Sequence, residues 1–267
     1  MRVRLLAAIL ILCVSAQACS KDDAQGDDMP AAVKEVVDAA ELGSPEAQFT
    51  LANMYYSGEG VAQDFAEAAD WMQKAAEQGH GGAQYNYGLL LANGEGVERN
   101  YSQAVQWWKA AAEQGHMEAQ YKLGAEFSID RGVEPDYASA AEWYRLAAEQ
   151  GHEQAELEIA ALYQKGKGVP QDYQLAVDWY TRAADQGNAL AAFSLGLMYS
   201  DGAGVEQDHV QGYRWLSIAA QRASADDEEK YAAARATAAA RLNPTQLADT
   251  DKRVQEWLLA LAQRTQQ

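Results

Sequence analysis

The chain has 267 residues, of which 39 are acidic and 21 are basic, so its formal net charge is −18. Hydrophobic residues make up 48% of it, a share typical of globular proteins that argues against wholesale disorder. The negative charge disfavours a general nucleic-acid binder, which needs basic patches to displace counterions from phosphates, and it disfavours electrostatic docking on anionic membranes.

The N-terminus has the order of a secretory signal peptide. Arg2 and Arg4 precede an apolar run from Leu5 to Val14, and small residues follow at positions 15–18. The apolar run is too short to span a bilayer stably. We therefore predict that residues 1–18 form an export signal that is removed, with a buried N-terminal helix as the less favoured interpretation.

The segment Ala16-Gln17-Ala18-Cys19 resembles a bacterial lipobox, in which the cysteine is diacylated and becomes the mature N-terminus. Ala16 departs from that pattern, which usually has leucine there. Lipidation would protect Cys19, the one cysteine left once Cys13 is removed. We expect lipidation at Cys19, and we expect this lipid to be the protein's sole membrane attachment. Ser20 resembles an outer-membrane sorting signal, so we expect an outer-membrane lipoprotein that faces the periplasm. Cleavage after Ala18 would instead give a soluble periplasmic or secreted protein.

Two short segments precede the main body. Residues 19–31 are rich in Ser, Lys, Asp, Gln and Gly and contain no aromatic residue, which predicts a flexible acidic tether. Residues 32–46 are expected to form a capping helix that ends near Gly43.

The body is an internal repeat with a step of 36 residues, and no residue is inserted or deleted across five copies. Three of its columns are Ala47, Ala83, Ala119, Ala155 and Ala191; Trp71, Trp107, Trp143, Trp179 and Trp215; and Gly60, Gly96, Gly132, Gly168 and Gly204. We assign residues 47–222 to five repeats.

Each copy predicts two helices. In the first copy, Ala47, Leu51 and Tyr55 line one face of the first helix, and glycines at 58 and 60 end it. Asp64 begins the second helix as an N-cap, with Ala68, Trp71 and Ala75 as its inward stripe. The equivalent N-caps are Asn100, Asp136, Asp172 and Asp208.

Three histidines also recur at this step: His80, His116 and His152. Ser44 and Asn188 share their column, which predicts a helix N-cap or an adjoining turn. A shared metal is disfavoured, because helices pack about 10 Å apart and a metal needs its ligands about 2 Å away. His209 stands in an aromatic column and is expected to replace an aromatic ring.

The pattern A-x-x-x-L-G-x-x-Y…G-x-G-V-x-x-D-Y-x-x-A-x-x-W-x-x-x-A-A-x-x-G resembles the Sel-one-like repeat family, a relative of the tetratricopeptide solenoids. The fourth copy carries most of it, at Ala155, Tyr163, Gly166, Gly168, Val169, Asp172, Tyr173, Ala176, Trp179, Ala183, Ala184 and Gly187. Departures include Ile159-Ala160, Phe127, Asp130 and Gly212. The resemblance implies an all-α, right-handed superhelical solenoid of five helix-turn-helix repeats with helical caps.

Residues 223–267 are expected to form the C-terminal helical cap that such an array needs. Acids at 226–229 suit a helix N-terminus, an alanine-rich helix follows to about Leu242, and Pro244 opens a final helix. The face with Trp257, Leu258 and Leu261 is the one candidate for a docking surface within this cap.

The resemblance also implies a concave groove lined by positions two, six and nine after the leading alanine of each first helix. From these columns we select eight candidate partner-binding residues: Phe49, Asn53, Tyr56, Tyr85, Leu89, Tyr121, Gln164 and Phe193. The mostly aromatic first column could instead pack between neighbouring repeats.

The expected function is therefore that of a non-catalytic adaptor or scaffold of the bacterial cell envelope that binds a protein or peptide. The partner is expected to carry a basic patch that complements the acidic chain. We find no nucleophile motif, phosphate loop, cofactor motif or metal-ligand spacing, which disfavours an envelope hydrolase. A cell-wall glycan binder that stacks sugars on Trp and Tyr is the second alternative.

Overall fold

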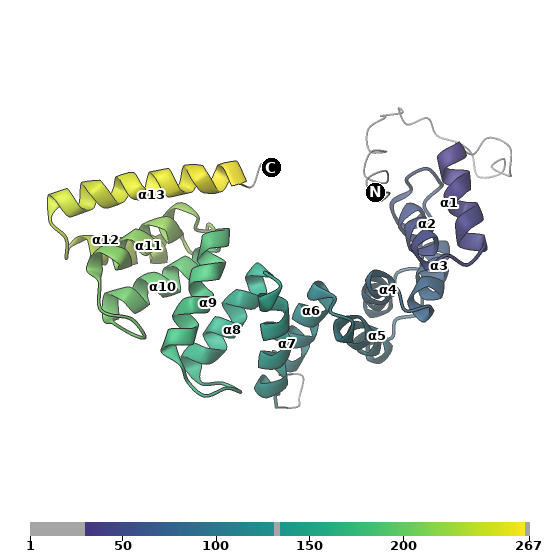
Figure 1. Cartoon of the computed structure of the whole chain (residues 1–267), viewed down its shortest axis with the longest axis horizontal. Helices are drawn as coiled ribbons and strands as arrows, with labels where there is room; N and C mark the ends of the chain where they lie inside the picture. Colours follow the sequence, from purple (N-terminus) through teal and green to yellow (C-terminus); the bar gives the residue numbers. More distant parts are fainter. Residues whose placement is uncertain (1–29, 131–133, 265–267) are drawn as a thin grey trace, which may run out of the picture.

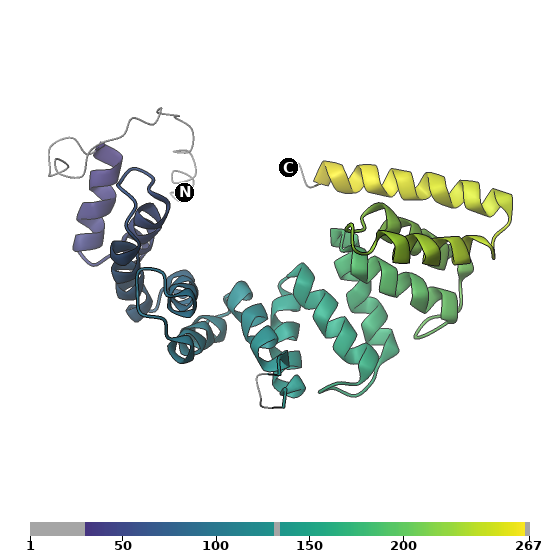
Figure 2. The same cartoon turned by 180° about the vertical axis from the view of Figure 1, so that it is seen from behind.

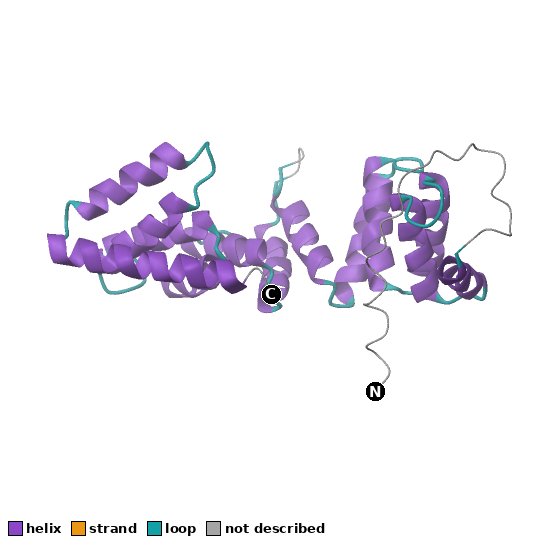
Figure 3. Ribbon diagram, turned by 90° about the horizontal axis from the view of Figure 1, so that it is seen from above, coloured by secondary structure: helices purple, strands orange, loops and turns teal. Residues whose placement is uncertain are grey.

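The computed structural model of the protein describes residues 30–130 and 134–264. The predicted signal peptide, Cys19 and nearly all of the tether lie outside the described residues. Within the described ranges the chain forms thirteen α-helices and no strand. These helices build the all-α solenoid that the sequence predicts (Figure 3). In that part of the chain no helix has the length and apolar character needed to cross a membrane.

The helices follow one another in pairs, with two helices for each repeat. Their bounds are α1 Ala31–Glu41, α2 Pro45–Ser57, α3 Phe65–Glu77, α4 Gly81–Asn93, α5 Tyr101–Glu113, α6 Met117–Ser128, α7 Tyr137–Glu149, α8 Glu153–Lys165, α9 Tyr173–Gln186, α10 Ala189–Asp201, α11 His209–Gln221, α12 Glu228–Ala239 and α13 Pro244–Arg264. The pairs follow an arc with α1 and α13 at its two ends, and α4 and α6 lie on its inner side (Figures 1 and 2).

The predicted N-caps of the second helices are confirmed. The carboxylate of Asp64 accepts hydrogen bonds from the backbone N–H groups of Ala66 and Glu67, and Asn100, Asp136, Asp172 and Asp208 cap their helices in the same way. These side chains satisfy backbone donors that a helix leaves unpaired at its start, so polar residues at one column set where every second helix begins.

The core differs from the prediction in one respect. The alanines of the predicted stripe are buried, but four tryptophans of the predicted column, from Trp71 to Trp179, are only half-buried. One residue further on, a fully packed side chain fills the space between the two helices of each repeat: Met72, Trp108, Tyr144, Tyr180 or Leu216. A step of one residue turns a helix by about 100°, so the tryptophans lie at the edge of the core.

Small residues on the first helix make room for these side chains. A Cβ atom at Gly88 would lie 2.4 Å from Nε1 of Trp108, and one at Gly124 would lie 2.5 Å from the ring of Tyr144. Trp108 also donates a hydrogen bond from Nε1 to the carbonyl of Tyr85. The glycine and the large residue therefore form one packing unit.

The loop inside the second, fourth and fifth repeats rests on the preceding repeat. Gly96 has a φ of +68°, and a Cβ atom there would lie 1.8 Å from the carbonyl oxygen of Phe65. Gly168 approaches Tyr137 and Gly204 approaches Tyr173 in the same manner. Glycine is needed in this column both for its backbone conformation and for close contact.

The last two helices close the C-terminal end. Tyr231 of α12 is buried, and Trp257 of α13 packs edge-on against Trp215 at a centroid distance of 6.2 Å. Leu258 packs on the same core, and Leu261 is buried. The face with Trp257 is therefore covered by the array and is not a free docking surface.

Candidate partner-binding face

The candidate site is the partly exposed side of the first helices of the repeats, α2, α4, α6, α8 and α10. We call this surface the first-helix face. Its side chains recur every 36 residues, so the same positions of each first helix line it from one end of the array to the other. Figure 1 shows α4 and α6 on the inner side of the arc, where a bound segment would contact several repeats at once.

The aromatic column takes part in packing between repeats. Phe49 stacks on His80, Tyr85 on His116 and Tyr121 on His152, with centroid distances of 4.5, 5.0 and 4.3 Å. Each pair joins the first helix of one repeat to the N-cap of the first helix of the next. The three aromatic rings remain half-buried, so each has one side in a joint and part of its surface on the first-helix face.

The histidines are helix N-caps, as predicted. Nδ1 of His80, His116 and His152 accepts a hydrogen bond from the backbone N–H three residues later, where Ser44 and Asn188 use an oxygen. Since Nδ1 accepts, Nε2 carries the proton in the neutral ring, and in His152 it donates to Glu118 at 3.1 Å. Burial lowers the pKa of His116 below its ordinary value. Among the described residues no cluster of potential metal ligands occurs.

The aromatic column is closed at the C-terminal end. Leu157 is buried, and Phe193 is only 8% exposed because Tyr231 of the cap stacks on it at 4.4 Å. Little of the Phe193 ring is left for a partner, although the sequence places it among the candidate binding residues. The repeat pattern ends before Tyr231, so it gives no sign of this cover.

Two of the other four candidate residues are hydrogen-bonded within the chain. Tyr56 donates from its hydroxyl to Glu95 at 2.8 Å, and Gln164 accepts from the hydroxyl of Tyr180 at 2.9 Å. Burial raises the pKa of Tyr180 to about 12, so this hydroxyl stays protonated and donates. Asn53 and Leu89 are half-buried on the first-helix face.

The third and fourth repeats make the middle of this face acidic. Burial is the main cause that raises the pKa of Tyr121, and the carboxylates of Glu158 and Glu118 raise it further. The one basic residue in this part of α6, Lys122, is engaged by Glu126 at 3.6 Å. Glu118 is 47% exposed, so Glu118 and Glu158 leave negative charge beside the Tyr121 ring.

The fifth repeat makes the end of the same face apolar. Leu190 stands in the column of Glu118 and is 44% exposed, and Leu197 stands in the column of Ala125 and is 39% exposed. The opposite sides of α10 are also apolar, with Leu195 and Met198 buried in the core. A helix that is apolar on all sides is normally covered on all sides, so this exposed side is available for another surface.

A column of buried polar side chains was not foreseen from the sequence. Gln48, Gln84, Gln120 and Glu156 are all buried at the joints between helix pairs. They stand one residue after the leading alanine at the 36-residue step, so the repetition itself was visible. Polar side chains of a helix normally face solvent, so the repetition alone does not reveal a buried structural role.

The tryptophans offer little free ring surface for sugars. The Lys74 ammonium lies 3.7 Å from the ring centroid of Trp71, and the guanidinium of Arg182 lies 4.5 Å from that of Trp179. These cations occupy one face of each ring, and the core covers part of the remainder. Stacking of a glycan on either ring would require its cation to leave.

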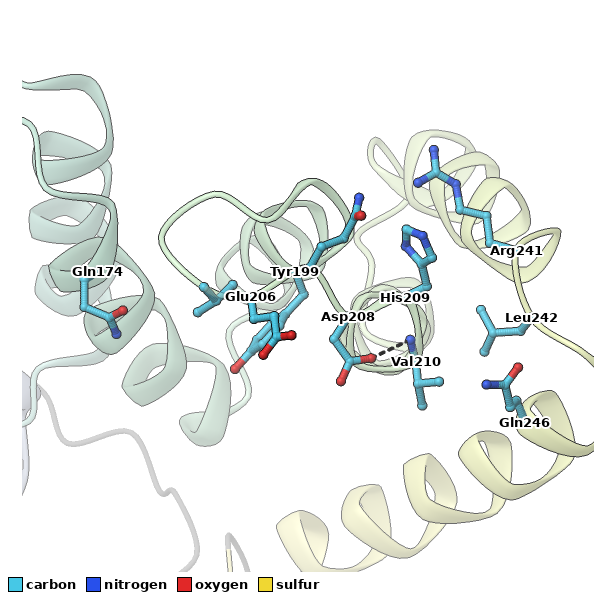
Figure 4. Close-up of a pocket in the computed structure, with 11 residues that line it drawn as sticks. Gln174, Tyr199, Glu206, Asp208, His209, Val210, Arg241, Leu242 and Gln246 are labelled. Atoms are coloured by element: carbon cyan, nitrogen blue, oxygen red, sulfur yellow. Dashed lines mark hydrogen bonds between the residues drawn. The ribbon is translucent and has the colours of Figure 1, made fainter.

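A pocket of about 740 Å³ lies at the C-terminal end, away from the predicted binding residues (Figure 4). Its lining includes His209, Asp208, Arg241 and Gln246. It lies where the loop of another repeat would rest, because His209 stands in the column of Tyr173 and Ala240 in that of Gly204. His209 does replace an aromatic residue there, and its Nδ1 atom is buried without a hydrogen-bond partner.

Comparison with known proteins agrees with the repeat register. The Sel1 repeat family matches residues 45–80, 82–116, 118–152, 154–188 and 189–224, about two-thirds of the chain. A search of curated proteins gives no match.

Two solved structures share both sequence and fold with the chain. One is c5321, a protective antigen present in uropathogenic Escherichia coli strains that displays an SLR fold, with 40% identity, a TM-score of 0.66 and coverage of 71% of this chain. This chain spans only 40% of that protein. The other is a Sel1 repeat protein from Oxalobacter formigenes, with 31% identity, a TM-score of 0.65, and coverage of 73% of this chain and 86% of that one.

Proposed function

Because the chain belongs to the Sel1 repeat family, we propose that it is a scaffold of the bacterial cell envelope that binds a partner protein along its first-helix face. Sel1 repeat proteins are generally non-catalytic protein-interaction scaffolds.

The observation that carries the proposal is the change of chemistry along one continuous face. The third and fourth repeats present Glu118 and Glu158 beside Tyr121, and the fifth presents Leu190 and Leu197. A complementary segment carries Lys or Arg opposite the acids and apolar side chains opposite the leucines. Such a segment has one favoured direction on the array, because reversing it would place its charges on the leucines.

The two parts of the face contribute differently to binding. Exposed ion pairs are each worth about 0.2–1 kcal/mol and are weakened by salt. Burial of apolar surface contributes about 25 cal/mol for each Å² removed from water. We therefore assign steering and register to the acids, and most of the dissociation barrier to the leucines and the half-buried aromatic rings.

The envelope location rests on the N-terminal sequence. An apolar run from Leu5 to Val14 after two arginines, followed by Ala-Gln-Ala and Cys19, supports export and lipidation. Two acyl chains would hold the protein firmly on a membrane surface. The intact mass of the protein from native membranes tests this, and we expect a chain that begins at Cys19 and carries acyl chains. Lipidation would be refuted if the acyl chains were absent and if both the native protein and the Cys19→Ala variant were found in the soluble fraction.

Charge reversal tests the binding face. The full-length protein is purified from native membranes with its partners, in the native form and with Glu118→Lys and Glu158→Lys combined. We expect the double variant to lose a partner that the native protein retains. The matched control combines Glu142→Lys and Asp178→Lys, which change the net charge equally at exposed positions of the second helices α7 and α9.

The control decides the outcome. Loss of the partner from the first-helix variant alone supports the proposal, and equal loss from both variants assigns the effect to net charge. If neither variant changes the set of retained proteins, and Leu190→Glu with Leu197→Glu also leaves it unchanged, the first-helix face is not the binding surface.

A further inference from the structure

The joints between helix pairs contain a ladder of buried glutamines. Nε2 of Gln48, Gln84 and Gln120 donates a hydrogen bond of 3.1 Å to a carbonyl at the end of the preceding helix, that of Ala40, Ala76 or Ala112. Oε1 of the same glutamines accepts one of 2.7 Å from a glutamine at the end of its own repeat, Gln78, Gln114 or Gln150. Each amide therefore ties together three helices, and it must both donate and accept to do so.

The fourth repeat has a carboxyl group in this column. Glu156 is 3% exposed and accepts a hydrogen bond of 2.8 Å from Nε2 of Gln186, which reproduces the accepting half of the ladder. The donating half has no equivalent while the group is ionised, because a carboxylate has no proton to donate. The carbonyl that occupies the place of Ala112 in this joint is that of Ala148, eight residues before Glu156 as in the other three joints.

We propose that Glu156 makes the joint between the third and fourth repeats pH-sensitive: the neutral carboxyl group completes the ladder by donating to the Ala148 carbonyl, and the carboxylate leaves it half-made. A protonated carboxyl group has one donor and an accepting oxygen, so it matches the glutamine amide in both roles. No other joint in the described part of the array has an ionisable group at this position, since the fifth repeat has Ala192 there.

The surroundings favour the neutral form. Burial raises the pKa of Glu156 above its usual 4.5; the hydrogen bond from Gln186 and the positive charge of Arg182 on α9 oppose this, and Glu153 on its own helix adds to it. On α7, Arg145 and Glu149 pair with each other at 2.6 Å at the surface. Because the folded pKa lies above the unfolded one, the contribution to stability is fully present below pH 4.5 and is lost as the pH rises through the folded pKa.

The position of this joint gives the titration a structural consequence. In a solenoid each repeat contacts only its neighbours, so stability depends on every joint separately. The joint at Glu156 separates the first three repeats from the last two and lies under the acidic middle of the first-helix face. Ionisation of one side chain would therefore loosen the array at its middle.

Thermal unfolding across about pH 4 to pH 8 tests the proposal in the full chain. Glu156→Gln is expected to raise Tm by about 2–4 °C at neutral pH and to leave it close to the native value at the acidic end. Gln120→Glu makes the reverse change in the preceding joint. It is expected to lower Tm at neutral pH, and part of this decrease in Tm should be recovered at acidic pH. Glu153→Gln is the control for loss of one charge near the same helix start.

Hydrogen exchange locates the effect. The amides of Gly151 and His152, which donate to Ala148 and Ala147, are expected to be better protected in Glu156→Gln than in the native protein at neutral pH, with no difference at acidic pH. The proposal is overturned if Glu156→Gln lowers or does not change Tm at neutral pH, or if its effect is the same at both ends of the range. It is also overturned if Glu153→Gln reproduces the effect.

Discussion

The joints of the first three repeats are built from the same contacts at each 36-residue step, whereas the C-terminal end is held by contacts that the repeats do not share. At an interior joint, Tyr85 stacks on the capping ring of His116, and Gln114 donates to Gln84. At the end, Phe193 stacks instead on Tyr231, a side chain of the cap helix α12. The aromatic column therefore stacks on another ring in both regions. In the interior that ring is a capping histidine of the next repeat, and at the end it is a tyrosine of the cap.

The end also has a polar network that the interior lacks. Tyr213 donates to Asp251 at 2.8 Å, and Arg235 donates to the Tyr213 hydroxyl at 2.9 Å and to Asp251 at 3.3 Å. These bonds join α11, α12 and α13. A repeated joint can extend an array to any length, but stopping it requires side chains that cover the last apolar face and match nothing beyond it.

The largest effect is expected in the interior, at Trp108. This ring is fully buried, so Trp108→Ala should destabilise the protein by about 3–5 kcal/mol. Trp143 is only half-buried, so Trp143→Ala should lower the free energy of unfolding clearly less than Trp108→Ala does. Chemical denaturation measures both, and equal losses would place the tryptophan column in the core after all.

The next effect belongs to the C-terminal end. Tyr231→Ala removes a buried ring and uncovers Phe193, at an expected cost of about 3 kcal/mol. Because the contact is specific to the end, faster hydrogen exchange should be confined to α12, α13 and the fifth repeat. Leu259→Ala, at an exposed site on α13, should change stability by less than about 0.5 kcal/mol. A global change in exchange would show that the end and the interior unfold as one unit.

A smaller effect is expected where a loop rests on the preceding repeat. Gly96→Ala and Gly115→Ala both place a side chain at positive φ, which costs about 1–2 kcal/mol. Only at Gly96 would the new Cβ atom also meet backbone, the Phe65 carbonyl, whereas nothing lies within 4 Å at Gly115. Gly96→Ala should therefore lower Tm further than Gly115→Ala, and equal values would mean that the loop contact is dispensable.

The smallest effect is expected in the polar network at the end. Arg235 and Asp251 are 40% and 47% exposed, so Asp251→Asn should cost no more than about 1 kcal/mol. Asparagine can still accept from Tyr213, which leaves one of the bonds in place. The difference should shrink in high salt, and a salt-independent loss of several kcal/mol would make this network a main support of the cap.

The periodic parts of the fold could be predicted because each depends on local chemistry. Asp64 and its equivalents cap helices through their own side chains, and the alanine columns are buried in every complete repeat apart from Ala47. The choice between Trp107 and Trp108 as the core residue could not be made from periodicity, because adjacent aromatic residues both satisfy the pattern. Packing against Gly88 decides it.

The candidate site was predicted less completely. The columns of the first-helix face were identified, but the stacking of Tyr85 and Tyr121 on histidines depends on contacts between repeats. The cover over Phe193 comes from outside the repeats. Gln164 has its own partner in Tyr180, which a column of polar residues does not disclose.

The most direct test of the central claim, that the first-helix face binds a partner, is photocrosslinking in native cells. A photoreactive amino acid is placed at Leu197 on the first-helix face or at Glu142 on the second-helix side, both of them exposed. We predict a discrete crosslinked product of higher mass from position 197 and none from position 142. A product from position 142 alone, or the same product from both positions, would contradict the account.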